Sequence, residues 1–254
     1  MPKLTLADIP PAEAEDIRHL QHKGIFINWQ KRYRLERSMR LAVRRVFRKL
    51  WKYVAAAQMK STFQEDAELE RLWAELFAIT AEYSEKAFEL GSADSVNRIN
   101  KIAGRQFTKD PAQEWLIGRS REFAEKFTTM SVETVQKTVF KVVEKGLQEG
   151  WSIRKMQTEM QRQYGIALRR GEVIARTTVI KSHNMGSMLQ SKEMGLSEVE
   201  LVGCDPECEE CQAVIADNPY PVDEAMAIEA DLHPNHAGSW VATHASVDAA
   251  LAMF

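Results

Sequence analysis

Apolar residues recur at spacings of three and four from about residue 11 to Gly195, and few glycines or prolines interrupt them. This period is that of an amphipathic α-helix, which turns one apolar stripe toward a core. The sequence therefore predicts a nearly all-helical region. The expected helices span residues 11–22, 29–60, 64–90, 92–106, 111–128, 131–149, 152–163 and 169–194.

The ends of these helices are predicted from short polar and flexible stretches. Ser61 and Thr62 precede an acidic first turn, and Asp110 precedes a proline at a first helical position, as N-caps do. Gly91 with Ser92, and later Gly165, interrupt the apolar period, and we expect a helix to end at each.

After Gly195 the pattern changes to alternation. Residues 197–204 alternate polar and apolar side chains, which predicts a strand with Val199 and Leu201 on one face. Residues 218–224 favour a loop, residues 239–244 a second short strand and residues 248–254 a terminal helical turn. The expected fold is mainly α: a multi-helix N-terminal region, then a small α+β C-terminal domain.

Charge divides the chain in the same way. The net charge is −2, yet residues 193–254 carry 13 Asp and Glu and no Lys or Arg, which leaves +11 on residues 1–192. Such asymmetry indicates that the two parts meet different surroundings. We expect no membrane span and no signal peptide, because no apolar run is long enough and the N-terminus is polar.

Basic residues concentrate in residues 31–52, which hold ten Lys and Arg against the single acid Glu36. This amphipathic pattern fits nonspecific DNA phosphates, an anionic membrane, an acidic protein surface or merely a solvated bundle face. The candidate DNA-binding or partner-binding residues are Arg34, Arg37, Arg40, Arg44, Arg45 and Arg48.

All three cysteines lie within the eight residues 204–211, and two histidines follow at 233 and 236. Cys208 and Cys211 form a C-x2-C pair, and His233 and His236 form a second close pair; the two pairs together are called the knuckle. Two such pairs joined by a loop can supply the four ligands of a tetrahedral structural zinc ion. Cys204 is an alternate ligand.

Other interpretations of this segment remain open. Asp205, Asp231 and His244 are further candidate ligands, and the thiols could simply be reduced cysteines in a polar loop. A redox pair is disfavoured, since Glu209 and Glu210 would raise the thiol pKa values. A catalytic zinc would need a general base such as Glu207, Glu209 or Glu210.

Several short motifs occur in a fixed order along residues 130–245. Ile174 to Thr177 read I-A-R-T, and Asn184 with Gly186 reads N-x-G. Asp205, Cys208 and Cys211 form D-x2-C-x2-C, and H-P-N follows from His233. In this order they resemble the Mu F-like phage head morphogenesis family, with Arg176, Thr177 and Asn184 as family-motif residues.

Two departures from the family pattern stand out. Thr178 occupies a position where the family usually has Glu, and His236-Ala-Gly replaces the usual Cys-Arg-Cys. The second departure suggests that His236 replaces a cysteine ligand. On the helix itself, Thr177, Lys181 and Asn184 share a face and could orient the following strand and knuckle through bonds to backbone atoms.

The resemblance implies a non-enzymatic minor head protein of a tailed phage, made in the host cytoplasm and located in the virion near the portal. Its partners would be portal and head proteins, with nonspecific DNA through the basic helix. The implied domains are residues 1–128, basic and helical, and residues 129–254, the head morphogenesis domain. The alternatives are a zinc-dependent hydrolase or nuclease, a phage-delivered effector module, or a host zinc-containing DNA-binding protein.

Overall fold

The computed structural model describes residues 29–59, 67–104, 141, 144–145, 148–151, 153–234 and 236–252. The protein is mostly helical, with a small antiparallel three-stranded sheet near its C-terminus. The expected fold class is thereby confirmed. The helices expected at 11–22 and 111–128, and most of 131–149, lie outside the described residues.

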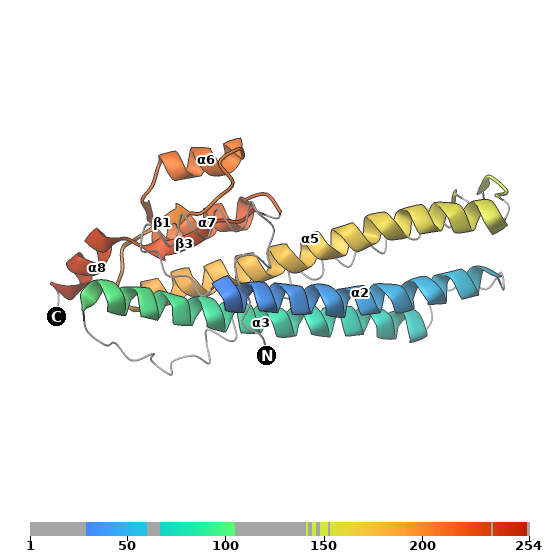
Figure 1. Cartoon of the computed structure of the whole chain (residues 1–254), viewed down its shortest axis with the longest axis horizontal. Helices are drawn as coiled ribbons and strands as arrows, with labels where there is room; N and C mark the ends of the chain where they lie inside the picture. The colour runs from blue at the N-terminus through green and yellow to red at the C-terminus, as the bar shows by residue number, and fades with distance from the viewer. Residues whose placement is uncertain are drawn as a thin grey trace.

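Three long helices form the body of the molecule: α2 (Trp29–Met59), α3 (Ala67–Ala103) and α5 (Ile153–Glu193). They lie side by side along the long axis, and the smaller elements gather at one end of this bundle (Figure 1). α5 packs against both other helices. Their shared core contains Met39, Val43, Val46, Phe47, Leu50, Leu69, Leu72, Leu76, Ala87, Ala175 and Val179.

The helix ends expected at Gly91 and Gly165 are wrong, because α3 and α5 each run through the glycine. A Cβ built on Gly91 would lie 1.8 Å from the carbonyl oxygen of His183 on α5, and one on Gly186 would lie 2.1 Å from that of Phe88 on α3. Gly91 therefore marks a close helix crossing. Gly165 continues α5 because one internal glycine costs only about 1 kcal/mol.

Small polar side chains line this crossing. Because the two backbones approach so closely, hydroxyl groups can reach across and bond each other directly. The buried hydrogen bonds between α3 and α5 are Ser84 to Ser182 at 2.6 Å, Ser92 to Gln190 at 2.7 Å, Ser95 to Ser191 at 2.9 Å and Asp94 to His183 Nε2 at 3.1 Å. These bonds fix the register of the two helices, because each donor must meet its own acceptor.

The C-terminal unit combines three strands with three short helices. The strands are β1 (Glu198–Val202), β2 (Tyr220–Pro221) and β3 (Ser239–Ala242), and the helices are α6 (Glu209–Ala216), α7 (Val222–Asp231) and α8 (His244–Leu251). The sheet has the order β2-β1-β3, and both pairings are antiparallel. The unit sits on the C-terminal half of α5, with α6 farthest from the bundle (Figure 1).

The two expected strands are confirmed, and Val199 and Leu201 are the buried face of β1. Residues 218–224 are not simply a loop, because they contain β2 and the first turn of α7. The turn expected near the C-terminus belongs to a longer helix, α8, whose N-cap Thr243 accepts a hydrogen bond from the backbone of Ser246 at 3.0 Å.

α3 also contacts the C-terminal unit directly. Its Arg98 donates from Nε to the carbonyl oxygen of Ala242 at 2.8 Å and lies 3.5 Å from Glu200. Burial lowers the pKa of Arg98, and the charge of Glu200 opposes that shift. The domain boundary expected at residue 128 lies outside the described residues.

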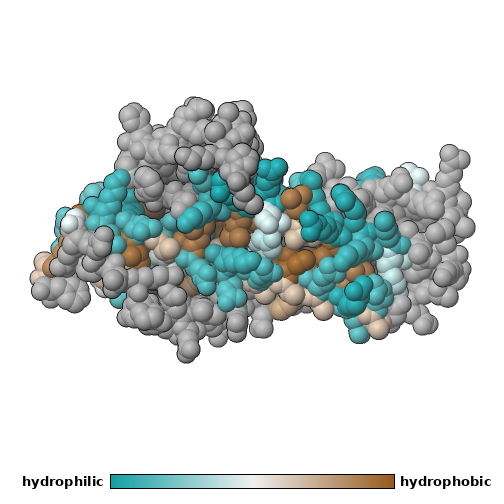
Figure 2. Space-filling view, turned by 60° about the horizontal axis from the view of Figure 1, so that its bottom comes forward, coloured by the Kyte–Doolittle hydropathy of each residue, from teal (hydrophilic) through white to brown (hydrophobic). Residues whose placement is uncertain are grey.

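The described surface is largely polar. Hydrophilic side chains cover much of the face shown in Figure 2, and apolar residues come to the surface there in separate patches along the long axis. Among the described residues, no helix combines the length and the apolar character that crossing a bilayer requires.

Because the helices cross so closely, replacing a glycine of the crossing with alanine should destabilise the protein rather than stabilise it. In an ordinary helix interior, Gly→Ala stabilises by about 1 kcal/mol. Gly91→Ala or Gly186→Ala should instead destabilise by about 3 kcal/mol, since the new methyl group meets a backbone carbonyl that cannot rotate away. Chemical denaturation measures the free energy of unfolding. The exposed α3 substitution Asn97→Ala is the control, and stabilisation by either glycine variant would contradict the crossing.

Candidate metal centre

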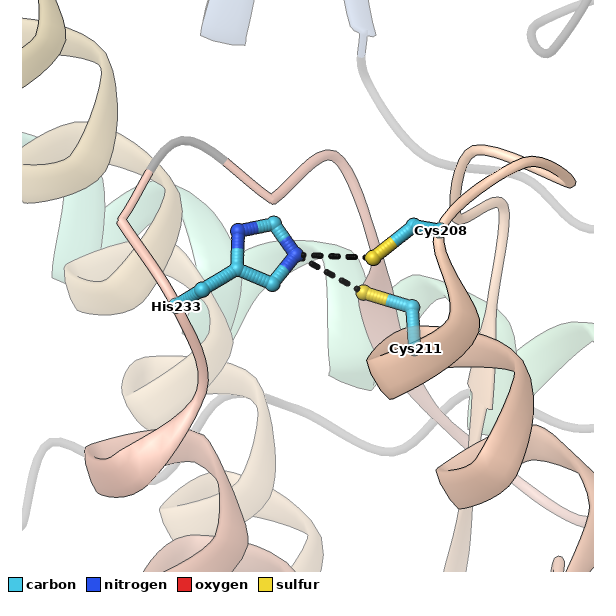
Figure 3. Close-up of side chains that lie close together, drawn as sticks. All are labelled: Cys208, Cys211 and His233. Atoms are coloured by element: carbon cyan, nitrogen blue, oxygen red, sulfur yellow. Dashed lines mark hydrogen bonds between the residues drawn. The ribbon is translucent and has the colours of Figure 1, made fainter.

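Cys208, Cys211 and His233 point toward one another at the outer edge of the C-terminal unit (Figure 3). His233 Nε2 lies 3.1 Å from Cys208 Sγ and 3.3 Å from Cys211 Sγ. The three donor atoms all lie within 4.8 Å of one another. Sulfur and imidazole donors this close together could hold a metal ion, and they suit borderline or soft metals.

Local structure explains how the two sulfurs meet. Cys208 is the N-cap of α6 and Cys211 lies in its first turn, so a spacing of three places both side chains on one side of the helix. His233 follows the end of α7. Its backbone N–H donates to Glu210 Oε1 at 3.0 Å, which ties the histidine segment to α6.

The three groups have different proton affinities. The backbone amide of Cys211 and the nearby His233 lower the pKa of Cys208, against the opposing effect of burial. Burial, followed by Cys204 and Cys208, raises the pKa of Cys211. The expected rise in the thiol pKa values does not occur at Cys208, whose pKa is lowered chiefly by the backbone amide of Cys211.

The Nε2 atom of His233 faces the two sulfurs with its lone pair. Its Nδ1 donates to the carbonyl oxygen of Pro234 at 2.9 Å, so the proton of the neutral ring is on Nδ1. Burial lowers the pKa of His233, but the Pro234 carbonyl and Cys208 outweigh it and raise that pKa overall. A metal ion at Nε2 would displace the competing proton.

Cys204 lies just behind the cluster. It is 6% exposed, and its proximity contributes to the raised pKa of Cys211. A Cβ on Gly238 would lie 2.4 Å from Cys204 Sγ, so only glycine leaves room for this thiol. Cys204 is not one of the three residues whose donor atoms lie together.

His236, the fourth predicted ligand, also lies outside the three-residue cluster. It is buried at 2% exposure, and its Nε2 lies 3.0 Å from Glu229 Oε1. Its ring is close to that of His233, with centroids 6.1 Å apart and planes at 78°. Asn235, between the two histidines, lies outside the described residues.

α5 holds the segments on both sides of His233. Lys181 Nζ donates to the carbonyl oxygens of Ala230 and Leu232 at 3.0 and 2.7 Å, at the C-terminal end of α7. Asn184 Nδ2 donates to the carbonyl oxygen of Gly238 at 3.0 Å. Lys181 and Asn184 thus both bond backbone atoms next to the knuckle, as expected from their place on one face of the helix.

The other two family-motif residues of α5 are at least partly buried. Thr177 is buried and Arg176 is half-buried. Burial lowers the pKa of Lys181, whereas Glu229, Asp231 and Glu210 raise it. The ammonium group therefore compensates acidic side chains around the knuckle as well as capping α7.

The six candidate arginines lie on α2, distant in sequence from the knuckle. Arg34, Arg37, Arg44, Arg45 and Arg48 are exposed, and Arg40 is half-buried. Arg40 forms an ion pair with Glu36 at 2.7 Å, and Arg44 pairs with Glu172 of α5.

The remaining ligand candidates lie outside the cluster. Asp205 Oδ1 accepts the backbone N–H of Glu207 in the turn before α6, while Asp231 and His244 are exposed. Glu210, considered above as a general base, accepts the backbone N–H of His233 instead.

Sequence reasoning missed Glu229, which is fully buried beside His236. A glutamate in a segment without strong periodicity gives no signal of burial.

Comparison with protein-family models, curated proteins and solved structures finds no match to this chain.

The geometry predicts which substitutions remove a bound metal. Purified wild-type protein should carry about one metal ion per chain, and Cys208→Ser, Cys211→Ser and His233→Ala should each lose it, because each removes one converging donor. Elemental mass spectrometry measures the content. The exposed His244→Ala is the matched histidine control. Equal metal in His233→Ala and wild type would contradict the site.

Proposed function

We propose that the chain is a non-enzymatic minor head protein of a tailed phage, in which a structural zinc ion staples the C-terminal unit. In this proposal the protein resides in the virion head near the portal. The basic helix α2 faces packaged DNA, and the C-terminal unit engages portal or head proteins.

The structural role of the metal rests on how little else holds α6. This helix has eight residues, of which only Cys211 is buried, while Val214 and Ile215 are half-buried against the core of the C-terminal unit. A short helix with so little buried apolar surface gains little from packing. A metal ion bridging Cys208 and Cys211 to His233 would join α6 to the segment after α7, and its binding free energy would add to folding.

The donor set suits zinc. Two thiols and an imidazole from a C-x2-C turn and a following histidine are the usual ligands of structural zinc, which needs four donors in a tetrahedron. Both sulfurs and Nε2 of His233 are already close to one another before any ion is considered. Structural zinc sites are closed by protein ligands, whereas catalytic sites retain an open position.

The phage assignment rests on the sequence resemblance, and the arrangement of its motifs supports it. Asn184 and the segment after the histidine motif are 54 residues apart along the chain, yet they meet in the structure. Asn184 bonds Gly238 behind the histidine motif, and Gly186 contacts α3 where a side chain would not fit. Asn184 therefore positions the histidine segment, and Gly186 positions the helix that carries Asn184.

The DNA contact is assigned to four arginines of α2. Arg34, Arg37, Arg45 and Arg48 are exposed, and within the described part of the chain none of them has a carboxylate partner. At 100° per residue they occupy one side of the helix, opposite the buried Met39, Val43 and Val46. A stripe of unpaired guanidinium groups favours phosphates without reading base sequence.

Assembly provides the direct test of the head role. When the chain is co-expressed with portal, scaffolding and major head proteins of the same genome, it should copurify with the particles in few copies. Cys208→Ser combined with His233→Ala should abolish incorporation, because the docking unit loses its staple, whereas His244→Ala should not. Quantitative mass spectrometry of purified particles measures the copy number. Portal-containing particles that lack the wild-type chain would refute the assignment.

Duplex DNA binding tests the arginine stripe. Fluorescence anisotropy across a salt series should give an affinity that falls with salt, and replacing Arg34, Arg37, Arg45 and Arg48 together with Ala should reduce the logarithmic slope by about 3 to 4. The control replaces Arg71, Lys86 and Arg162, which already pair with Glu68, Glu82 and Glu159. Equal slopes for the stripe variant and the wild type would exclude this contact.

A further inference from the structure

We propose that His236 is the fourth metal ligand through Nδ1, and that buried Glu229 is the positioning residue that holds its ring in the required tautomer. This inference rests on the proposed metal site and completes it. It assigns a task to the pair Glu229 and His236, which the cluster of Cys208, Cys211 and His233 leaves unexplained.

The first observation is an unsatisfied nitrogen. His236 is 2% exposed, and its Nδ1 has no hydrogen-bond partner among the described residues. A buried polar atom without a partner costs about 1–3 kcal/mol, so native proteins rarely retain one without a reason. A metal ion would accept the lone pair of this nitrogen and remove the cost.

The second observation fixes which nitrogen is available. Nε2 of His236 lies 3.0 Å from Glu229 Oε1, and a carboxylate accepts the proton that Nε2 carries. The neutral ring then has its lone pair on Nδ1. Metal-bound histidines commonly donate their other ring N–H to a carboxylate, which fixes the ring and strengthens the ligand.

The third observation is the place of the ring. The centroids of His233 and His236 lie 6.1 Å apart, with planes at 78°. Two imidazoles on one tetrahedral zinc, each with a Zn–N bond of about 2.0–2.1 Å, have centroids about 5 Å apart. The two rings are thus about 1 Å farther apart than two imidazoles that share one zinc ion.

The carboxylate that positions His236 is itself held on several sides. Glu229 is fully buried, and its second oxygen accepts Trp240 Nε1–H at 2.9 Å. The ammonium group of Lys181 interacts electrostatically with Glu229. A buried carboxylate is costly unless it is paired, and this one has two hydrogen-bond donors and a nearby cation. The network therefore holds Glu229 in one orientation.

Cys204 is the competing fourth ligand. Its thiol is buried close to Cys211, but it leaves the buried His236 nitrogen without a partner and gives Glu229 no task. The two ligand sets differ in sulfur count: His236 gives two thiolates and two imidazoles, and Cys204 gives three thiolates and one imidazole.

Cadmium NMR distinguishes the two sets without a mutation. In full-length protein loaded with ¹¹³Cd and labelled with ¹⁵N-histidine, we expect scalar coupling of the metal to Nε2 of one histidine and Nδ1 of another. The His233→Ala and His236→Ala variants assign the two signals. Coupling to a single histidine, or to Nε2 of His236, would overturn the proposal.

Two variants test the positioning role of Glu229. Glu229→Gln should weaken zinc binding about 10- to 100-fold in a chelator competition, because the amide no longer fixes the His236 tautomer. The exposed Glu224→Gln on the same helix is the matched control and should change zinc affinity less than 3-fold or so. An unchanged zinc affinity in Glu229→Gln would refute the positioning role.

Cobalt substitution adds a readout that misfolding alone would not mimic. Co²⁺ in the wild type should show tetrahedral d–d bands with charge transfer from two thiolates, and Cys204→Ser should leave both unchanged. Loss of one thiolate signal in Cys204→Ser would make Cys204 the ligand and overturn the assignment of His236. Wild-type protein that binds neither zinc nor cobalt would instead refute the metal site itself, a result distinguishable from failure of the fourth ligand alone.

Discussion

The backbone contact between α3 and α5 determines where the rest of the molecule can lie. At Gly91 and Gly186 each helix leaves no room for a side chain on the other, so the two axes approach closely and hydroxyl groups bond across the gap. α5 is thereby held along its C-terminal half, from Ser182 to Ser191. The same half carries Lys181, Asn184 and Ser187, the donors for the C-terminal unit. The rigid crossing with α3 thus makes this part of α5 a fixed platform for the unit.

The platform acts through side-chain donors to backbone carbonyls. Lys181 reaches the end of α7, Asn184 reaches Gly238, and Ser187 donates to the carbonyl oxygen of Trp240 at 3.1 Å. A small sheet and three short helices bury limited apolar surface, so such bonds matter more here than in a large core. Because two of the three bonds flank the segment from His233 to Gly238, α5 sets the position of the histidine half of the knuckle. The cysteine half depends on α6, which is the less supported of the two.

The sequence predicted the parts of this structure whose signals are local. Alternation placed β1, the helical period placed α2, and the C-x2-C spacing brought Cys208 and Cys211 together. What it could not predict depends on contacts distant along the chain. Gly91 has the same local signal whether it ends a helix or admits a neighbouring backbone. Likewise, the burial of Glu229 becomes evident only when α7 packs against α5 and Trp240 arrives from β3.

Ion pairs within the molecule partly balance the charge asymmetry of the sequence. Residues 193–254 contain no Lys or Arg, so every Lys or Arg that meets an acid of this segment comes from residues 1–192. Arg98 approaches Glu200, Lys192 pairs with Asp223 at 2.6 Å, and Lys181 lies among the acids of the knuckle. These cations come from α3 and α5. Four exposed arginines of α2 pair with no acid among the described residues: Arg34, Arg37, Arg45 and Arg48. For this reason α2, rather than the bundle as a whole, is the surface on which a polyanionic partner is proposed.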